Sequence, residues 1–223
     1  VIHKKDTFYA FVPLQLQTII ENANHNFLNK AKAIIVGGAP ISVLQEKLFI
    51  STGLPIFSTY GMTETCTHIA IRKIGKSSFK ALNDVFFKVD ENDCLIIKSS
   101  TAIENPLLTN DIVSLITEKE FVWKGRADNV INTGGVKILV EELESKISKA
   151  LVASNQNINF IIASKKDDKL GDKIILIANK KFDIARIEKA LNTYEKPKSY
   201  YFIPNFPKTE TGKIDRKKLL VMV

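Results

Sequence analysis

The chain has 223 residues, of which 45% are hydrophobic and 25% charged, a composition typical of a soluble globular protein with one large or two modest domains. Two cysteines without a CxxC pair and only three histidines argue against a disulfide framework and a structural zinc site. No apolar run approaches the roughly 18 residues of a membrane span, and we expect a cytoplasmic protein. The first residue is Val1, and we interpret the chain as a piece of a longer protein.

The net charge of +8 is unevenly distributed. Residues 1–128 carry 14 lysines and arginines against 13 acidic residues, whereas residues 129–223 carry 18 against 11. A basic C-terminal part favours a polyanionic ligand. Nucleic acid is one candidate, but the lysines are scattered and lack the interleaved aromatic residues of a base-stacking platform. A solvated basic face is the alternative interpretation.

The first third of the chain predicts a βαβ-like order. Residues 12–28 are expected to form a helix, because Pro13 suits a first turn and apolar residues recur with helical spacing. A short strand over 33–36, a helix over about 41–51 and a strand over 55–59 follow. In open parallel sheets, ligands bind beyond the carboxyl ends of the strands.

Two unusual stretches lie at such strand ends: "GGAP" (37–40) and "STYGMTET" (58–65). The second carries five hydroxyl groups and one carboxylate in eight residues, more polar groups than a buried strand satisfies easily. It is either a threonine-rich strand end with a turn at Gly61 or a ligand loop. Its position after a strand favours the ligand loop.

The rest of the chain predicts hairpins first and then a separate α+β module. Hairpins are expected over 85–98 and 111–125. Beyond residue 128 we expect a hairpin (130–138), a helix (140–152), strands (158–164 and 173–178), a helix (183–192) and a strand (199–203). The predicted fold class is thus α/β plus α+β: residues 1–128 form part of a large domain with a βα sheet and β-hairpins, and residues 129–223 form a small mobile α+β domain.

Several common catalytic motifs are absent from the sequence. The Gly-Lys pair at 212–213 is not a phosphate-binding P-loop, because Pro207 and Ile214 stand where that motif needs glycine and serine or threonine. GxGxxG, HExxH and GxSxG sequences do not occur.

Five stretches, in this order, resemble the motifs of the adenylate-forming ligases, the family of acyl-CoA synthetases, luciferases and peptide-synthetase adenylation domains. They are "GGAP" (37–40), "STYGMTET" (58–65), "LLTND" (107–111), "GRADNVINTGGVKI" (125–138) and "PKTETGKIDRKKL" (207–219). Each is weak alone, but five in register are a strong signal. The resemblance covers nearly the whole chain and implies the second half of such an acid–thiol ligase. Within the family, residues 11–20, 31–41 and 54–70 look most like the o-succinylbenzoate–CoA ligases of menaquinone biosynthesis.

The resemblance implies a nucleotide site in the first part of the chain. Tyr60 would stack on adenine, Thr63 would contact phosphate, and Glu64 would hold Mg²⁺, a hard cation that prefers carboxylate oxygen. Asp111 would accept hydrogen bonds from both ribose hydroxyls, and Arg126 would add donors. Without the resemblance, Asp111 would be read as a turn cap and Arg126 as half of a surface ion pair. The nucleotide contacts so implied are Gly38, Ala39, Pro40, Ser58, Thr59, Tyr60, Gly61, Met62, Thr63, Asp111 and Arg126.

The resemblance also assigns roles in the second part. Asp128 matches the hinge about which the small domain turns, and Gly134 and Gly135 match a turn that lines the pantetheine channel. Lys137 matches a basic position that reaches the ATP phosphates. Lys213 matches the catalytic lysine that bridges the carboxylate and the α-phosphate.

The chain departs from the family pattern at three points. Asn110 stands where the family usually has glycine, and the "GVK" around Lys137 replaces the commoner sequence. The glycine-, serine- and threonine-rich loop that wraps the β- and γ-phosphates is not within these 223 residues.

The implied reaction uses ATP, Mg²⁺ and coenzyme A. A small-molecule carboxylate attacks ATP to give an acyl-adenylate and pyrophosphate, and the coenzyme A thiol then displaces AMP. The expected partners are these small molecules and the missing N-terminal part of the same chain, with no nucleic acid and no membrane span. The alternatives are another aryl or fatty acid, a carrier-protein thiol as acceptor, a non-catalytic nucleotide-binding fragment, and a nucleic-acid binder.

Overall fold

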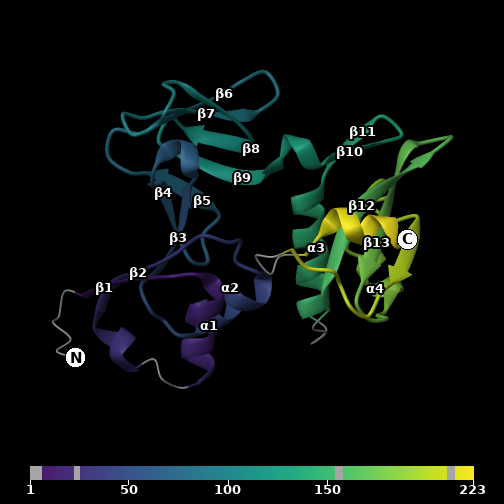
Figure 1. Ribbon diagram of the computed structural model, residues 1–223, viewed down its shortest axis with the longest axis horizontal. Coiled ribbons are helices and arrows are strands. Elements are labelled where there is room, and N and C mark those ends of the chain that lie inside the picture. Colours follow the sequence, from purple (N-terminus) through teal and green to yellow (C-terminus); the bar gives the residue numbers. More distant parts are fainter. Residues whose placement is uncertain (1–6, 23–25, 154–157, 210–213) are drawn as a thin grey trace. The chain divides into compact units, whose positions relative to one another are not determined.

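The structure is a computed structural model that describes residues 7–22, 26–153, 158–209 and 214–223 (Figure 1). It divides into two compact units, Val1–Lys124 and Gly125–Val223. That the two units are the functional domains, hinged at Asp128, stays a prediction.

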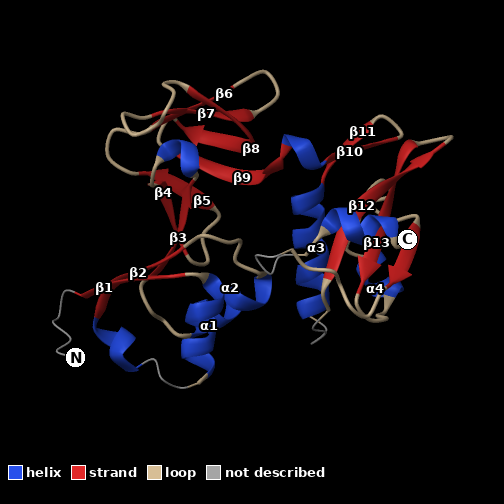
Figure 2. Ribbon diagram, viewed as in Figure 1, coloured by secondary structure: helices blue, strands red, loops and turns tan. Residues whose placement is uncertain are grey.

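The first unit begins with three parallel strands, which Figure 2 shows in red beside two helices. The strands are β1 (Thr7–Phe11), β2 (Ala31–Val36) and β3 (Ile56–Gly61), in this spatial order. Helix α1 (Pro13–Glu21), the short helix η1 (Asn26–Lys30) and helix α2 (Val43–Ser51) connect them. The helices bury their apolar side chains against the strands, in a core formed by Leu16, Ile20, Leu28, Ile34, Val36, Phe49 and Ile56.

Local sequence explains where the two helices begin. Pro13 occupies the first turn of α1, where its missing N–H costs nothing. Ser42 caps α2: its hydroxyl accepts from the Gln45 N–H at 3.2 Å, and its own N–H donates to Gln45 Oε1 at 2.9 Å. Gln45 also donates to Gln17 Oε1 at 3.0 Å, which ties α2 to α1.

The sheet continues from β3 into antiparallel strands that build the rest of the first unit. These are β4 (His68–Lys73), β5 (Ser78–Ala81), β6 (Phe86–Val89), β7 (Cys94–Lys98), β8 (Leu107–Thr117) and β9 (Glu120–Arg126), and the spatial order is β1-β2-β3-β4-β5-β9-β8-β7-β6. A 3-10 turn, η2 (Thr63–Thr65), separates β3 from β4. The core of this part contains Ile69, Val85, Phe87, Leu95, Ile97, Leu107, Val113 and Phe121.

The second unit is a five-stranded sheet with helices on both faces. It begins with η3 (Ala127–Asn129), followed by β10 (Val130–Thr133), β11 (Val136–Leu139), α3 (Val140–Val152), β12 (Phe160–Asp167), β13 (Gly171–Ala178), α4 (Ile184–Glu188), β14 (Ser199–Phe202) and α5 (Arg216–Val221). The sheet order is β11-β10-β13-β12, and β14 pairs with β13 in parallel. Alternation along β13 serves both faces: Ile174 and Leu176 pack with α3, whereas Ile175 and Ile177 pack with Leu219 of α5.

The expected fold class, α/β followed by α+β, is confirmed, and the helix expected over 140–152 is α3. Two expected helices were too long. The helix over 12–28 ends at Glu21, and the helix over 183–192 ends at Glu188, where the chain enters turns. Strands β1, β4 and β5 and helix α5 were not predicted. Among the described residues, no helix combines the length and apolar character needed to cross a bilayer.

Candidate active site

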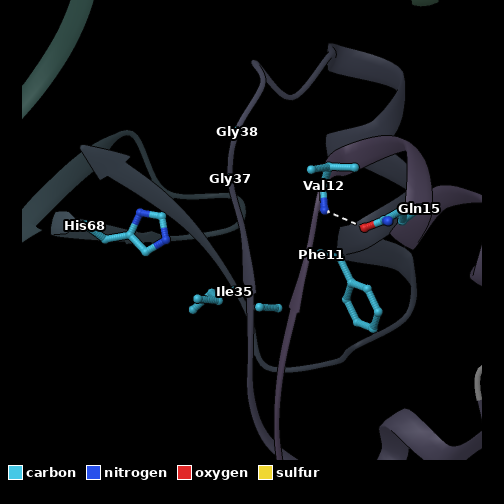
Figure 3. Close-up of a pocket in the computed structure, with 8 residues that line it drawn as sticks. Phe11, Val12, Gln15, Ile35, Gly37, Gly38 and His68 are labelled. Carbon is cyan, nitrogen blue, oxygen red and sulfur yellow. Dashed lines mark hydrogen bonds between the residues drawn. The ribbon is translucent and has the colours of Figure 1, made fainter. Parts of the chain in front are cut away.

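Two adjoining hollows lie at the carboxyl ends of the parallel strands, as expected for an open α/β sheet. The first, of about 310 Å³, has apolar walls from Phe11, Val12 and Ile35 (Figure 3). The second, of about 300 Å³, is lined by Thr59, Gly61, Met62 and Thr63 of the "STYGMTET" stretch and by Cys66 and Thr67 after it. Gly38 and His68 line both hollows, so the two spaces meet at these residues.

Glycine is required at two of these positions because neighbouring atoms occupy the space of a side chain. A Cβ on Gly61 would lie 2.5 Å from the Thr67 carbonyl oxygen, since β4 pairs with the end of β3 at this point. A Cβ on Gly37 would lie 2.2 Å from Thr59 Oγ1. Gly38 has a φ of +79°, which favours glycine for a different reason, the backbone conformation itself.

Thr65 organises the loop that follows Gly61. Its side chain is fully buried, and its hydroxyl accepts from the Met62 N–H at 3.0 Å. The same hydroxyl lies 2.9 Å from the Met62 carbonyl and 2.8 Å from the Thr67 carbonyl, either of which accepts its proton. The polar character of this stretch is therefore partly structural, and it leaves Thr63 and Glu64 exposed.

Thr63 and Glu64 are the residues predicted to contact phosphate and magnesium. Thr63 lines the second hollow, and the main chain of Glu64 is fixed by the Ile103 N–H, which donates to its carbonyl at 2.9 Å. Among the described residues, no three histidine, cysteine or acidic side chains gather as a metal site. One exposed carboxylate fits a magnesium ion that is held mainly by substrate phosphates and water.

Tyr60 and Asp111, which are 51 residues apart in sequence, lie side by side. The Tyr60 hydroxyl donates to Asp111 Oδ2 at 2.6 Å, and Trp123 Nε1 donates to Asp111 Oδ1 at 3.2 Å. Asp111 is buried, with 6% of its surface exposed. The Tyr60 ring packs edge-on against Phe121 at 5.1 Å and tilted against Phe79 at 5.8 Å. Asp111 is thus a buried acceptor that positions Tyr60, and its role toward ribose stays a prediction.

The remaining residues of the predicted nucleotide site in the first unit differ in exposure. Ser58 is buried within β3 at 8% exposure, and Met62 packs partly buried against the core that contains Phe121. Ala39 and Pro40 are exposed on the loop between β2 and α2. Direct contact of these residues with a nucleotide stays a prediction.

In the second unit, Gly134 and Gly135 form the two-residue turn of the β10–β11 hairpin. Both have positive φ, +57° and +82°, so the backbone of this turn itself favours glycine. A Cβ on Gly135 would meet no atom of the described residues within 4 Å, and the Gly134 N–H donates to the Leu170 carbonyl at 2.9 Å. Lys137 follows on β11 with an exposed side chain, paired across the hairpin with Asn132.

Arg126 and Asp128, predicted as a nucleotide contact and a hinge, form an ion pair at 2.9 Å between Nη2 and Oδ2. Both side chains are about half exposed, at 45% and 56%. The surface ion pair that was the plain alternative for Arg126 therefore does form. A nucleotide contact of the same guanidinium stays a prediction.

Lys213 lies outside the described residues, but the chain on both sides of it is well held. Lys208 and Ile214 form an antiparallel bridge, and the Asp215 N–H donates to the Pro207 carbonyl at 2.8 Å. Arg216 then donates to both oxygens of Glu144, at 2.8 and 3.0 Å. Burial raises the pKa of the Glu144 carboxyl, and the charge of Arg216 opposes that shift.

Sequence reasoning missed three residues that the structure brings to these places. His68 lines both hollows, Trp123 donates to Asp111, and Glu141 contacts the segment around Arg126. Trp123 carried a signal, because it is two residues from the "GRADN" stretch on a strand expected to pair with that of Asp111. For His68 no signal was available without the β3–β4 pairing.

Comparison with known proteins gives consistent results, although no family model matches the chain. A 2-succinylbenzoate–CoA ligase of Listeria monocytogenes is 27% identical over 94% of this chain and 50% of its own length. The chain spans about half the length of the curated relatives it matches.

Solved structures agree with this result. An acyl-CoA synthetase (AMP-forming)/AMP-acid ligase II-like protein from Dyadobacter fermentans is 32% identical, with a TM-score of 0.54, over 98% of this chain and 66% of that one. The o-succinylbenzoate CoA synthetase of Bacillus subtilis, solved with its acyl-adenylate intermediate, has a TM-score of 0.79 at 21% identity, over 96% of this chain and 51% of that one. The same enzyme solved with ATP and magnesium has a TM-score of 0.77 at 19% identity, over 97% and 52%. At these identities the Bacillus structures establish the fold alone.

Proposed function

Because this chain belongs to the adenylate-forming ligase family and corresponds to the C-terminal half of its members, we propose that the full-length protein is an ATP-dependent acid–CoA ligase. The acid we propose is o-succinylbenzoate, the substrate named for the curated relatives. In the first step a carboxylate oxygen attacks the α-phosphorus of ATP, and pyrophosphate leaves. In the second step the thiol of coenzyme A attacks the acyl carbon, and AMP leaves.

One observation carries this proposal: Tyr60 and Asp111, from two separate motifs, are joined by a 2.6 Å hydrogen bond next to the carboxyl ends of the parallel strands. A fixed aromatic ring at such an edge is suited to stack on a base, and a carboxylate is suited to accept from ribose hydroxyls. The adjoining hollows offer space for the acid, with apolar walls and the imidazole of His68.

The chain's own residues would serve the reaction mainly by positioning and by charge. The Thr63 hydroxyl would donate to a phosphate oxygen, and the Lys213 ammonium would stabilise the negative charge that builds as the carboxylate attacks. Magnesium, held by Glu64 and the phosphates, would supply charge neutralisation. Gly134 and Gly135 would leave room for the pantetheine arm, because a Cβ at Gly135 points into open space.

The test uses the full-length protein and separates the two half-reactions. Pyrophosphate exchange into ATP, measured with o-succinylbenzoate and with a panel of aryl and fatty acids, reports adenylate formation. Conversion of supplied o-succinylbenzoyl-adenylate and coenzyme A to thioester reports the second step. Exchange that depends on o-succinylbenzoate supports the proposal, exchange with a different acid reassigns the substrate, and no exchange with any acid rejects the activity.

Lys213→Ala sharpens the test. Loss of one charge-stabilising contact to the transition state typically slows a reaction about a hundred- to thousandfold. We expect such a loss for adenylate formation and little change for the reaction of supplied adenylate with coenzyme A. Equal slowing of both half-reactions would make Lys213 structural rather than catalytic.

A further inference from the structure

The segment Gly125–Asn129 contains the residues predicted to act as a nucleotide contact and a hinge, and one side chain outside it holds it in place. That side chain is Glu141, in the first turn of α3. The Asn129 side-chain amide donates to Glu141 Oε1 at 2.6 Å, and the Arg126 N–H donates to Oε2 at 3.4 Å. Both carboxylate oxygens are therefore used on this segment.

Gly125 makes this contact possible. A Cβ on Gly125 would lie 2.5 Å from Glu141 Oε2 and 3.2 Å from Glu141 Cδ, so any other residue would displace the carboxylate. The φ of Gly125 lies outside the positive range that favours glycine, so the close approach of Glu141 is what favours glycine at this position. The lack of a side chain on Gly125 thus leaves the space that the Glu141 carboxylate occupies.

The contact with Glu141 affects Arg126 and Asp128, the two residues of the segment that have predicted roles. Arg126 pairs with Asp128 through its guanidinium while its main chain is bonded to Glu141. Asp128 lies in the 3-10 turn Ala127–Asn129, whose last residue is bonded to the other oxygen of Glu141. A rotation of the backbone at Asp128 would carry Asn129 relative to Arg126, and the two bonds to one carboxylate could not both persist.

We propose that Glu141 is a positioning residue of the ligase reaction. It fixes Gly125–Asn129 in one backbone conformation and so sets the ratio of the rates of the two half-reactions. This inference rests on the proposed function and on a turn at Asp128. Glu141 touches no reacting atom and acts through Arg126 and Asp128. Its release would accompany the turn that separates adenylate formation from thioester formation.

The experiment uses the full-length protein, two ways of breaking the contact and one charge control. Glu141→Ala removes the carboxylate. Gly125→Ala keeps the charge but pushes the carboxylate away from the segment. Asp168→Asn is the control, because it removes one exposed acidic charge from the same unit without a described contact to the segment.

Two readouts are needed, and the first does not depend on activity. Hydrogen exchange of the peptide covering residues 125–130 should be at least about fivefold faster in Glu141→Ala and Gly125→Ala, because local opening no longer breaks these bonds. The second readout is the ratio of the two half-reaction rates, which should shift at least about fivefold in the same direction in both variants. Asp168→Asn should leave both readouts within about twofold of the parent.

Several results would overturn the proposal. Equal slowing of both half-reactions would mean general damage, and an effect of Glu141→Ala that Gly125→Ala does not share would mean a charge effect at α3. Unchanged hydrogen exchange in both variants would mean that the contact with Glu141 does not hold Gly125–Asn129. If the parent protein makes no adenylate with any acid, the proposed function is wrong, and so is the claim about the ratio of the two rates. The hydrogen-exchange data would still decide whether Glu141 holds Gly125–Asn129.

Discussion

Asp111 in the first unit and the β10–β11 hairpin in the second unit present predicted functional residues in opposite ways. In the first unit, Asp111 is 6% exposed and bonded to two aromatic residues, and Thr65 is fully buried with its hydroxyl shared among three backbone groups. In the second unit, Gly135 and Lys137 are exposed on a hairpin. Asp111 is part of the folding core, so its substitution will cost stability as well as binding. Gly135 and Lys137 lie outside the core, so their substitutions will report mainly on function.

The largest effect is expected for Asp111→Ala. The substitution leaves the Tyr60 hydroxyl and the Trp123 N–H without their buried acceptor, and each such group typically costs about 1–3 kcal/mol. We expect the free energy of unfolding of the full-length protein to fall by about 3 kcal/mol, measured by urea denaturation followed by circular dichroism.

Tyr60→Phe is the matched control for Asp111→Ala. It removes one donor but leaves Trp123 bonded to the carboxylate, so a loss of about 1 kcal/mol is expected. Loss of AMP affinity in Asp111→Ala beyond that in Tyr60→Phe, measured by calorimetry, would support the ribose contact. If Asp111→Ala were as stable as the parent, the described core role of Asp111 would be wrong.

Gly61→Ala is expected to come next. Its Cβ would lie 2.5 Å from the Thr67 carbonyl and 2.9 Å from His68 Cα, both backbone atoms that cannot move without shifting β4. Overpacking of this kind costs about 1–3 kcal/mol, and we expect a loss near 2 kcal/mol by the same urea method. Gly53→Ala is the control, because Gly53 has positive φ and no atom of the residues described in the structure lies within 4 Å of its Cβ.

Gly135→Ala tests the exposed turn of the β10–β11 hairpin in the second unit. Positive φ at this position costs about 1 kcal/mol for alanine, and within the part of the chain that the structure describes no atom opposes the added methyl group. We therefore expect a small stability change together with a slower reaction of supplied adenylate with coenzyme A. Gly135→Leu should slow that step further, and normal thioester formation in Gly135→Leu would remove the pantetheine assignment.

The smallest effect on stability is expected for Lys137→Ala. An exposed strand residue away from the core usually changes the free energy of unfolding by less than about 0.5 kcal/mol. If Lys137 reaches ATP phosphates, the KM for ATP will rise while stability stays constant. An unchanged KM would leave Lys137 as a solvated surface residue and would sharpen the contrast with Asp111.

Sequence reasoning located the elements that carry strong local signals and missed those that depend on distant partners. Helix α3, expected over about 140–152, was predicted correctly, because apolar side chains recur along one face over its whole length. Strand β4 was missed because its pairing with β3 and β5 defines it, and its own apolar run, Ile69 to Ile71, is short. The helix expected over 183–192 ends early, at Glu188, because the residues after it form turns in which the Asn192 N–H donates to the Glu195 carboxylate.

The same distinction applies to the site. Motif order placed Tyr60, Thr63 and Asp111 in one hypothesis, but it could not reveal that Asp111 bonds to Tyr60 and to Trp123. Such a contact requires three strands to be in register. The contact of Glu141 with Gly125 was likewise hidden, because it joins a helix to the end of strand β9 through space and neither residue is unusual alone.

The indole that donates to Asp111 is the only tryptophan in the chain. Emission from this ring depends on the polarity of its surroundings, so the 223-residue chain contains a single optical reporter located beside the carboxylate predicted to receive ribose. The second unit contributes no tryptophan signal. Titration of the chain with AMP, followed at tryptophan wavelengths, would therefore report on the first unit alone.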